Sequence, residues 1–201
     1  TGIFVGIRTA QSAVYTSTDA QNWNILSSSG MTLSPTAIGY CSGLGMFVIC
    51  GTSSTVFTSV DGRTWKPSLT VSVVACSPTT IIVGGANSTD NSIQYIWSST
   101  DGVNWTRQTI SGSGLTITAM TWSPGISGIG GQFLLGTSTG TIQTSPDGVT
   151  WTARTSGLGS SQINQIAFGG TGATGTIVAV GAAGAITTSL DNGATWNPAT
   201  Y

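Results

Sequence analysis

The sequence predicts an all-β chain built from five copies of one four-stranded antiparallel unit. A short box containing one Asp and one Trp recurs five times along the 201 residues, with its Asp residues 42, 40, 46 and 44 positions apart. A repeat period of that size indicates one supersecondary unit copied along the chain. Short runs rich in β-branched and aromatic residues lie between the boxes, separated by Gly, Ser and Pro. No stretch shows a sustained 3.6-residue period, so we expect essentially no helix.

Each unit is predicted to contain four strands, with the box as the turn between the third and the fourth. Just before each box lies an apolar run that ends in Gly, at 3–6, 48–51, 81–84, 133–136 and 178–181. Four units carry a further strand upstream, at 36–41, 72–76, 116–122 and 163–168. The last strand of each unit is expected to start at the box Trp. The first unit lacks the upstream strand, which gives nineteen strands rather than twenty.

The box has a mechanical explanation as a turn. An Asp carboxylate accepts hydrogen bonds from backbone amides two or three residues on, the Gly that follows tolerates a positive φ, and the Trp buries a large apolar surface. The first box has Ala20 in place of that Gly, and the fifth box is one residue longer. We therefore assign a structural role to the five Asp–Trp pairs: Asp19 and Trp23, Asp61 and Trp65, Asp101 and Trp105, Asp147 and Trp151, Asp191 and Trp196.

Four-stranded antiparallel units of this length, arranged radially, form a β-propeller. We predict a single five-bladed domain over 1–201, with blades at approximately 1–33, 34–70, 71–111, 112–157 and 158–201. The first blade lacks its inner strand in this segment. That strand is expected upstream of Thr1 or from another segment, because pairing of the terminal strands is how a propeller closes its ring.

The boxes resemble the Ser/Thr-x-Asp-x-Gly-x-Thr-Trp pattern of Asp-box (BNR-type) repeat proteins, over practically the whole chain. The second, third and fourth copies match best. The weakly charged repeats look like those of phage tail-associated and adhesin-like surface proteins. The resemblance implies boxes on the blade periphery, away from any ligand site. The chain is also similar in its boxes to the propeller that assists photosystem assembly, but four scattered arginines do not form the Arg-rich patch of that protein, so we set this resemblance aside.

The residue inventory argues against an enzyme. Sialidases of the same family share an arginine triad, a Tyr nucleophile assisted by Glu, and an Asp acid, whereas this chain has no Glu and no His. Asp90 is the one Asp outside the boxes, so a two-carboxylate glycosidase lacks its second group. Without His, neither a Ser-His-Asp triad nor a His-containing zinc site can form. We predict no catalytic residues, no metal and no cofactor.

A binding site is predicted on the face that carries the loops between the second and third strands. The longest of these loops, 86–94, contains Asn87, Asp90 and Asn91 and leads into Tyr95, and Arg8 lies in the corresponding region of the first blade. Short polar side chains beside an aromatic ring suit sugar hydroxyls. A solvated loop without a ligand is the alternative.

The three cysteines have no metal-like spacing. Cys41 and Cys76 align with Trp122 and Phe168 at the end of the upstream strand. Equivalent positions in neighbouring blades favour buried, unbridged side chains, with a Cys41–Cys76 disulfide as the less favoured alternative.

These observations predict a non-catalytic module for recognition or structural assembly, extracellular or on a virion or cell surface, associated with a phage tail or fibre and with a glycan as one candidate ligand. The expected partners are a cell-surface glycan or neighbouring protein subunits. Five basic residues and a net charge of −1 argue against nucleic acid, and no apolar run is long enough for membrane insertion. The alternatives are a secreted multivalent lectin and a non-catalytic part of a sialidase-like glycoside hydrolase.

Overall fold

The computed structural model describes residues 2–8, 13–26, 35–51, 56–67, 71–86, 94–110, 116–171 and 174–199. Within these ranges the chain forms nineteen strands in five antiparallel sheets, one with three strands and four with four. One 3-10 turn, Ala182–Gly184, interrupts this pattern. No helix in the described part of the chain is long and apolar enough to cross a membrane.

The strands follow the predicted order in every blade. Blade 1 contains β1 (Phe4–Arg8), β2 (Ala13–Ser17) and β3 (Asn24–Leu26), and blade 2 contains β4 (Pro35–Cys41), β5 (Met46–Gly51), β6 (Phe57–Ser59) and β7 (Lys66–Pro67). Blade 3 contains β8 (Val73–Cys76), β9 (Ile81–Ala86), β10 (Gln94–Ser99) and β11 (Thr106–Thr109). Blade 4 contains β12 (Ile117–Ile126), β13 (Ile129–Thr137), β14 (Ile142–Ser145) and β15 (Thr152–Arg154), and blade 5 contains β16 (Ile163–Gly169), β17 (Thr176–Gly181), β18 (Ile186–Ser189) and β19 (Asn197–Pro198).

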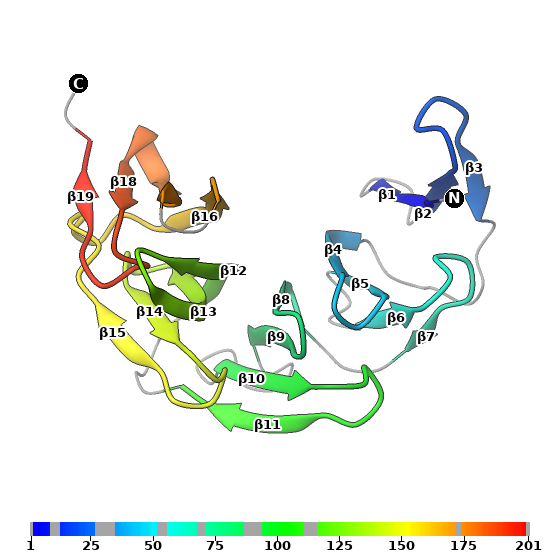
Figure 1. The fold of residues 1–201 in the computed structure, drawn as a ribbon, viewed down its shortest axis with the longest axis horizontal. Coiled ribbons are helices and arrows are strands. Elements are labelled where there is room, and N and C mark those ends of the chain that lie inside the picture. The colour runs from blue at the N-terminus through cyan, green and yellow to red at the C-terminus, as the bar shows by residue number, and fades with distance from the viewer. Residues whose placement is uncertain are drawn as a thin grey trace.

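The five sheets follow one another around a common centre, as in a β-propeller with five blades (Figure 1). The first strands of blades 2 to 5, β4, β8, β12 and β16, lie toward the centre, and the last strands lie at the periphery. Blade 1 and blade 5 stand at the two ends of an arc, with the chain termini on either side of its opening. Blade 1 has three strands because its innermost strand is the equivalent of β5, not of β4.

Neighbouring blades pack through alternate residues of their second and third strands. We call the side of a blade that meets the next blade its forward face, and the opposite side its backward face. Val48 of β5 packs forward onto blade 3, while Phe47 and Ile49 pack backward onto blade 1. The alternation of strand side chains between two faces explains this division. In blades 2 to 4 both faces are apolar because each of these sheets is buried between two others, and their strands are therefore continuous apolar runs.

The last strand of each blade begins one residue after the box Trp, not at the Trp as predicted. The Trp instead closes the box turn and packs backward: Trp65 contacts the core between blades 1 and 2, and Trp196 the core between blades 4 and 5. The indole of Trp196 also donates from Nε1 to the Gly193 carbonyl of its own box at 3.1 Å. Packing on the preceding blade thus holds the rings of Trp65 and Trp196 in place.

The prediction that Cys41 and Cys76 are unbridged was wrong, because the two residues form a disulfide. They are not equivalent positions: Cys41 pairs with Met46 in its sheet, whereas Cys76 pairs with Ile81. This offset of one residue places Cys41 on the forward face of blade 2 and Cys76 opposite it on blade 3, with their Cα atoms 5.2 Å apart. The disulfide thus joins two blades. The remaining cysteine, Cys50, is free and fully buried.

Candidate functional site

The box turns are rigid and their carboxylates are already engaged. In the third box, Asp101 Oδ1 accepts hydrogen bonds from the Val103 and Asn104 amides, both at 2.8 Å, and from the Ser99 hydroxyl at 3.0 Å. Ser99 Oγ in turn accepts from the Gly102 amide at 2.8 Å. The Val103 and Asn104 amides hold the pKa of Asp101 well below its usual range. An acceptor used in this way is unsuited to act as a base or a ligand.

The other boxes repeat this arrangement. Asp19, Asp61 and Asp147 each accept two turn amides at 2.7–2.9 Å, and Asp191 accepts one at 2.8 Å. The extra residue of the fifth box, Asn192, is fully buried and donates from Nδ2 to the Gly130 carbonyl of blade 4 at 2.7 Å. The additional residue therefore ties two blades together.

The predicted loop site is only partly described. Asn87, Asp90 and Asn91 lie outside the described residues. Arg8 ends β1 and is exposed, while Tyr95 lies half-buried on β10. The Arg107 guanidinium sits over the Tyr95 ring, 4.7 Å from its centre, and Trp97 packs against the same ring at 5.5 Å. Tyr95 thus belongs to an aromatic–cation cluster of blade 3, and nothing described brings Arg8 to it.

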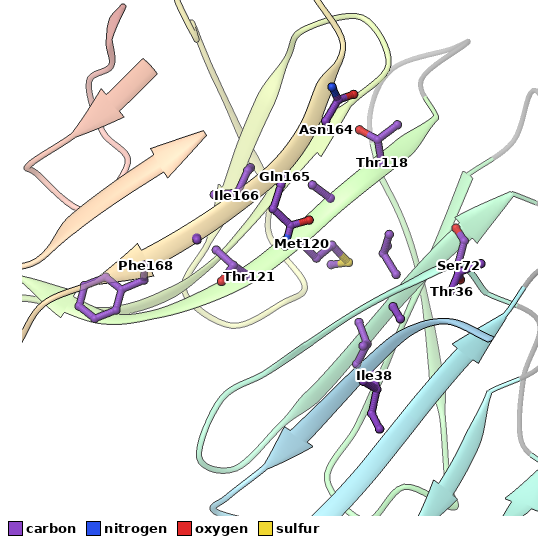
Figure 2. Close-up of a pocket in the computed structure, with 15 residues that line it drawn as sticks. Thr36, Ile38, Ser72, Thr118, Met120, Thr121, Asn164, Gln165, Ile166 and Phe168 are labelled. Atoms are coloured by element: carbon purple, nitrogen blue, oxygen red, sulfur yellow. The ribbon is translucent and has the colours of Figure 1, made fainter. Parts of the chain in front are cut away.

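A hollow with a volume of about 550 Å³ lies at the centre of the propeller, and we call it the central channel. It is lined by the innermost strands β4, β8, β12 and β16, and Figure 2 shows their side chains pointing into the space between the blades. None of its lining residues is charged. Among the described residues, no three His, Cys, Asp or Glu side chains are grouped closely enough to hold a metal.

One mouth of the channel is polar. Corresponding places around the channel are occupied by polar residues at or just before the starts of the four innermost strands: Thr36, Ser72, Thr118 and Asn164. Three of them sit where the pairing with the second strand is shifted by one residue, between Pro35 and Ala37 in blade 2 and at the matching steps of blades 4 and 5. A β-bulge of this kind turns an additional side chain out of the ladder, and such bulges are common beside functional sites.

The hydroxyls of this polar mouth are held in place by backbone carbonyls. The Ser72 hydroxyl donates to the Gly84 carbonyl at 3.4 Å. The Thr118 hydroxyl lies 3.1 Å from the Gly136 carbonyl, the same position one blade further on, and 2.5 Å from the Ile163 carbonyl of blade 5. Asn164 accepts at Oδ1 from Gln162 at 3.0 Å. A hydroxyl that donates its proton to a carbonyl still has lone pairs with which it can accept a hydrogen bond from a ligand. The mouth therefore presents positioned, neutral hydrogen-bonding groups.

The opposite ends of the innermost strands carry aromatic residues. Tyr40, Trp122 and Phe168 lie at one register position, with Cys76 as the fourth member. Of these, Phe168 lines the channel, whereas Trp122 packs against the core between blades 3 and 4. Tyr40 is 55% exposed and packs on Phe47 with ring centres 4.6 Å apart. In Figure 2, Asn164 lies at the polar end of β16 and Phe168 at its aromatic end. The channel can hold a neutral molecule that combines hydroxyl or amide groups with an apolar face.

Similarity to solved structures identifies the fold. YCF48 from Cyanidioschyzon merolae aligns with 93% of this chain and 66% of its own, at 15% identity and a TM-score of 0.61. Virginiamycin B lyase from Staphylococcus aureus aligns with 100% of this chain and 67% of its own, at 11% identity and a TM-score of 0.77. The chain is a β-propeller. At these identities the likeness shows the fold alone.

A structure of YCF48 bound to D1 peptide also aligns, at 16% identity and a TM-score of 0.57, over 92% of this chain and 60% of that one. The chain therefore spans between 60 and 67% of the length of these propellers. No family model and no curated protein matches the sequence. The four arginines, Arg8, Arg63, Arg107 and Arg154, lie on four different blades.

The sequence pointed to the loop face but missed the residues of the polar mouth. Thr36, Ser72, Thr118 and Asn164 are common polar residue types in loops that precede strands. The available signal is positional: each lies at the start of the innermost strand of its unit.

Proposed function

We propose that this chain is an Asp-box propeller without catalytic activity that binds a neutral, hydroxyl-rich ligand, a glycan, at the polar mouth of its central channel. The observation that carries the proposal is the uncharged lining of the channel, with Thr118 and Asn164 turned inward at bulges. Neutral acceptors and amides beside apolar groups are the partners that sugar hydroxyls require.

The position of this mouth supports the proposal. Thr36, Ser72, Thr118 and Asn164 lie at the starts of the innermost strands, so the mouth opens on the face where β9 ends at Ala86 and β10 begins at Gln94. A channel lined by four blades offers one central site, which favours a single site over the alternative of one lectin site per blade. The engaged state of the box carboxylates supports a module without acid–base chemistry.

The disulfide supports the proposed location. Cys41–Cys76 closes a separation of 35 residues and joins two blades. Disulfides persist in oxidising surroundings and are rare in reducing ones. We therefore propose an extracellular, virion or cell-surface setting, in keeping with the near absence of charge on a chain rich in Ser and Thr.

A protein ligand is the second candidate, because one solved propeller of the same fold is bound to a peptide. The backbone of an extended peptide would use the same neutral groups of the channel, so the two candidates share a site. The two candidates are distinguished by which ligand, a glycan or a peptide, binds in the channel.

The experiment is a screen of the purified chain against glycans and extended peptides, followed by calorimetry of any hit with site variants. We expect saturable glycan binding that Asn164→Ala and Gln165→Ala each weaken at least tenfold. Gln21→Ala, an exposed amide in the first box, serves as the matched control and leaves binding unchanged. Binding that survives both channel variants would refute the channel site, and saturable binding to peptides only would favour the second candidate.

A further inference from the structure

Blade 5 ends the arc with an apolar face built like the internal faces between blades. On its forward face, Ile186 is 36% exposed and Val180 is 37% exposed. The residues that correspond to Ile186 in the other four blades are buried, with exposures of 2, 0, 0 and 0%: Val14, Val56, Ile96 and Ile142. This position, three residues before the box Ser, is thus buried in every blade that is followed by another blade.

The chemistry of this face matches one internal face closely. By register, Val178, Val180 and Ile186 correspond to Val5, Ile7 and Val14, which form the forward face of blade 1. That face packs against Phe47, Ile49 and Phe57 of blade 2. Two faces that carry apolar side chains at the same register positions are expected to accept the same kind of neighbour.

The box glycine identifies which kind of neighbour fits. In blades 2 to 5 the box Gly is buried against the second strand of the preceding blade. A Cβ built at Gly62 would lie 2.9 Å from Val5, one at Gly193 would lie 2.8 Å from Leu134, and those at Gly102 and Gly148 would overlap Met46 and Ile82. Glycine is the residue that fits at this point of an incoming blade without a shift, because a side chain there meets a side chain of the neighbouring strand.

Blade 1 lacks that glycine. Its box carries Ala20 at φ 59°, in the same turn geometry as the glycines of the other boxes, and Ala20 is exposed. The backward face of blade 1 is open as well: Phe4 is 50% exposed, while the corresponding Phe47 and Phe133 are 8 and 2% exposed. Blade 1, of this chain or of a second copy, therefore presents a methyl group at the point where, in blade 2, a Cβ would lie 2.9 Å from Val5, the residue that corresponds to Val178 of blade 5.

We propose that the forward face of blade 5 is a docking face for a further blade of the Asp-box type, one with glycine in its box and apolar residues on its backward face. The proposal rests on continuity with the four internal interfaces. The solved propellers, of which this chain covers 60 to 67%, are long enough to contain such additional units.

The test measures whether a glycine-box blade covers Ile186. The variant Ile186→Cys places a thiol on the face, and its rate of maleimide labelling reports exposure. The other free thiol, Cys50, is fully buried and stays silent. Leu190→Cys is the matched control, because Leu190 is 61% exposed at a box position whose equivalent Val60 stays 72% exposed between packed blades.

Three proteins are compared: the 201-residue chain, the chain extended after Tyr201 by a copy of 34–70 with its cysteines replaced by alanine, and the same extension with alanine at the glycine of its box. We expect the glycine extension to slow labelling at position 186 at least tenfold. We expect the alanine extension to restore most of the original rate, with labelling at 190 equal in all three. Limited proteolysis is run in parallel, because a docked blade resists cleavage.

Several results would overturn the proposal. Equal labelling rates with and without the glycine extension would overturn it. This holds whether the extension is folded or remains sensitive to protease, because a blade that docks on this face becomes ordered there. Protection of the Ile186→Cys thiol already in the unextended chain would also do so. Light scattering then shows whether a second copy or closure on blade 1 provides the cover.

Discussion

The packing of the box glycines yields a quantitative prediction for Gly193→Ala. Gly193 has φ 85°, and a Cβ there would lie 2.8 Å from Leu134 Cδ2 and 3.2 Å from Thr144 Cγ2, both fully or almost fully buried. The left-handed backbone costs a residue with a Cβ about 1–2 kcal/mol, and overpacking a core adds about 1–3 kcal/mol. We expect a loss of about 2–5 kcal/mol in the free energy of unfolding from the two effects together.

Gly128→Ala separates the two effects. Gly128 has φ 82°, close to that of Gly193, and nothing lies within 4 Å of a Cβ built on it. This variant is expected to lose only the backbone component, about 1–2 kcal/mol. The assay is urea unfolding followed by Trp fluorescence, with the slope of the transition compared between variants. Equal losses for Gly193→Ala and Gly128→Ala would show that the box requires glycine for its backbone alone and would refute the packing argument.

The remaining predictions concern the box carboxylates and the cysteines. The turn amides lower the folded-state pKa of Asp19, Asp61 and Asp101 below the unfolded value near 3.8. The contribution of these carboxylates to stability is therefore complete above about pH 4 and is lost as the pH falls below it. The urea midpoint of unfolding should drop between about pH 4 and 2. Between about pH 6 and 8 the midpoint should stay flat, since the chain has no His and burial raises the pKa of Cys50 to about 12; a marked change in this window would contradict the assignment. Asp101→Ala should lower the thermal midpoint and leave ligand affinity unchanged, and lost affinity at unchanged stability would contradict its structural role. Reduction of Cys41–Cys76 should cost about 2–4 kcal/mol for a loop of 35 residues, an effect that the Cys41→Ser/Cys76→Ser variant should no longer show.

The composition of the polar mouth illustrates a limit of sequence reasoning. Thr118 could be assigned to the start of a strand, but the bulge between Ile117 and Ala119 follows from pairing with β13. The direction of its side chain depends on that pairing, because a shift of one residue moves a side chain to the other face. For the same reason Cys41 and Cys76 were aligned with each other, although their sheets place them one position apart.

The sequence by itself determined the repeat, the all-β class, the order of the nineteen strands and the missing inner strand of blade 1. These features follow from local chemistry: turn residues at fixed intervals and apolar runs between them. Only the tertiary structure decided which side chains meet across blades, namely the Cys41–Cys76 disulfide, the contact of Gly193 with Leu134 and the exposure of Ile186. Contacts between blades depend on the register and facing of two sheets distant in sequence, and no local pattern specifies both.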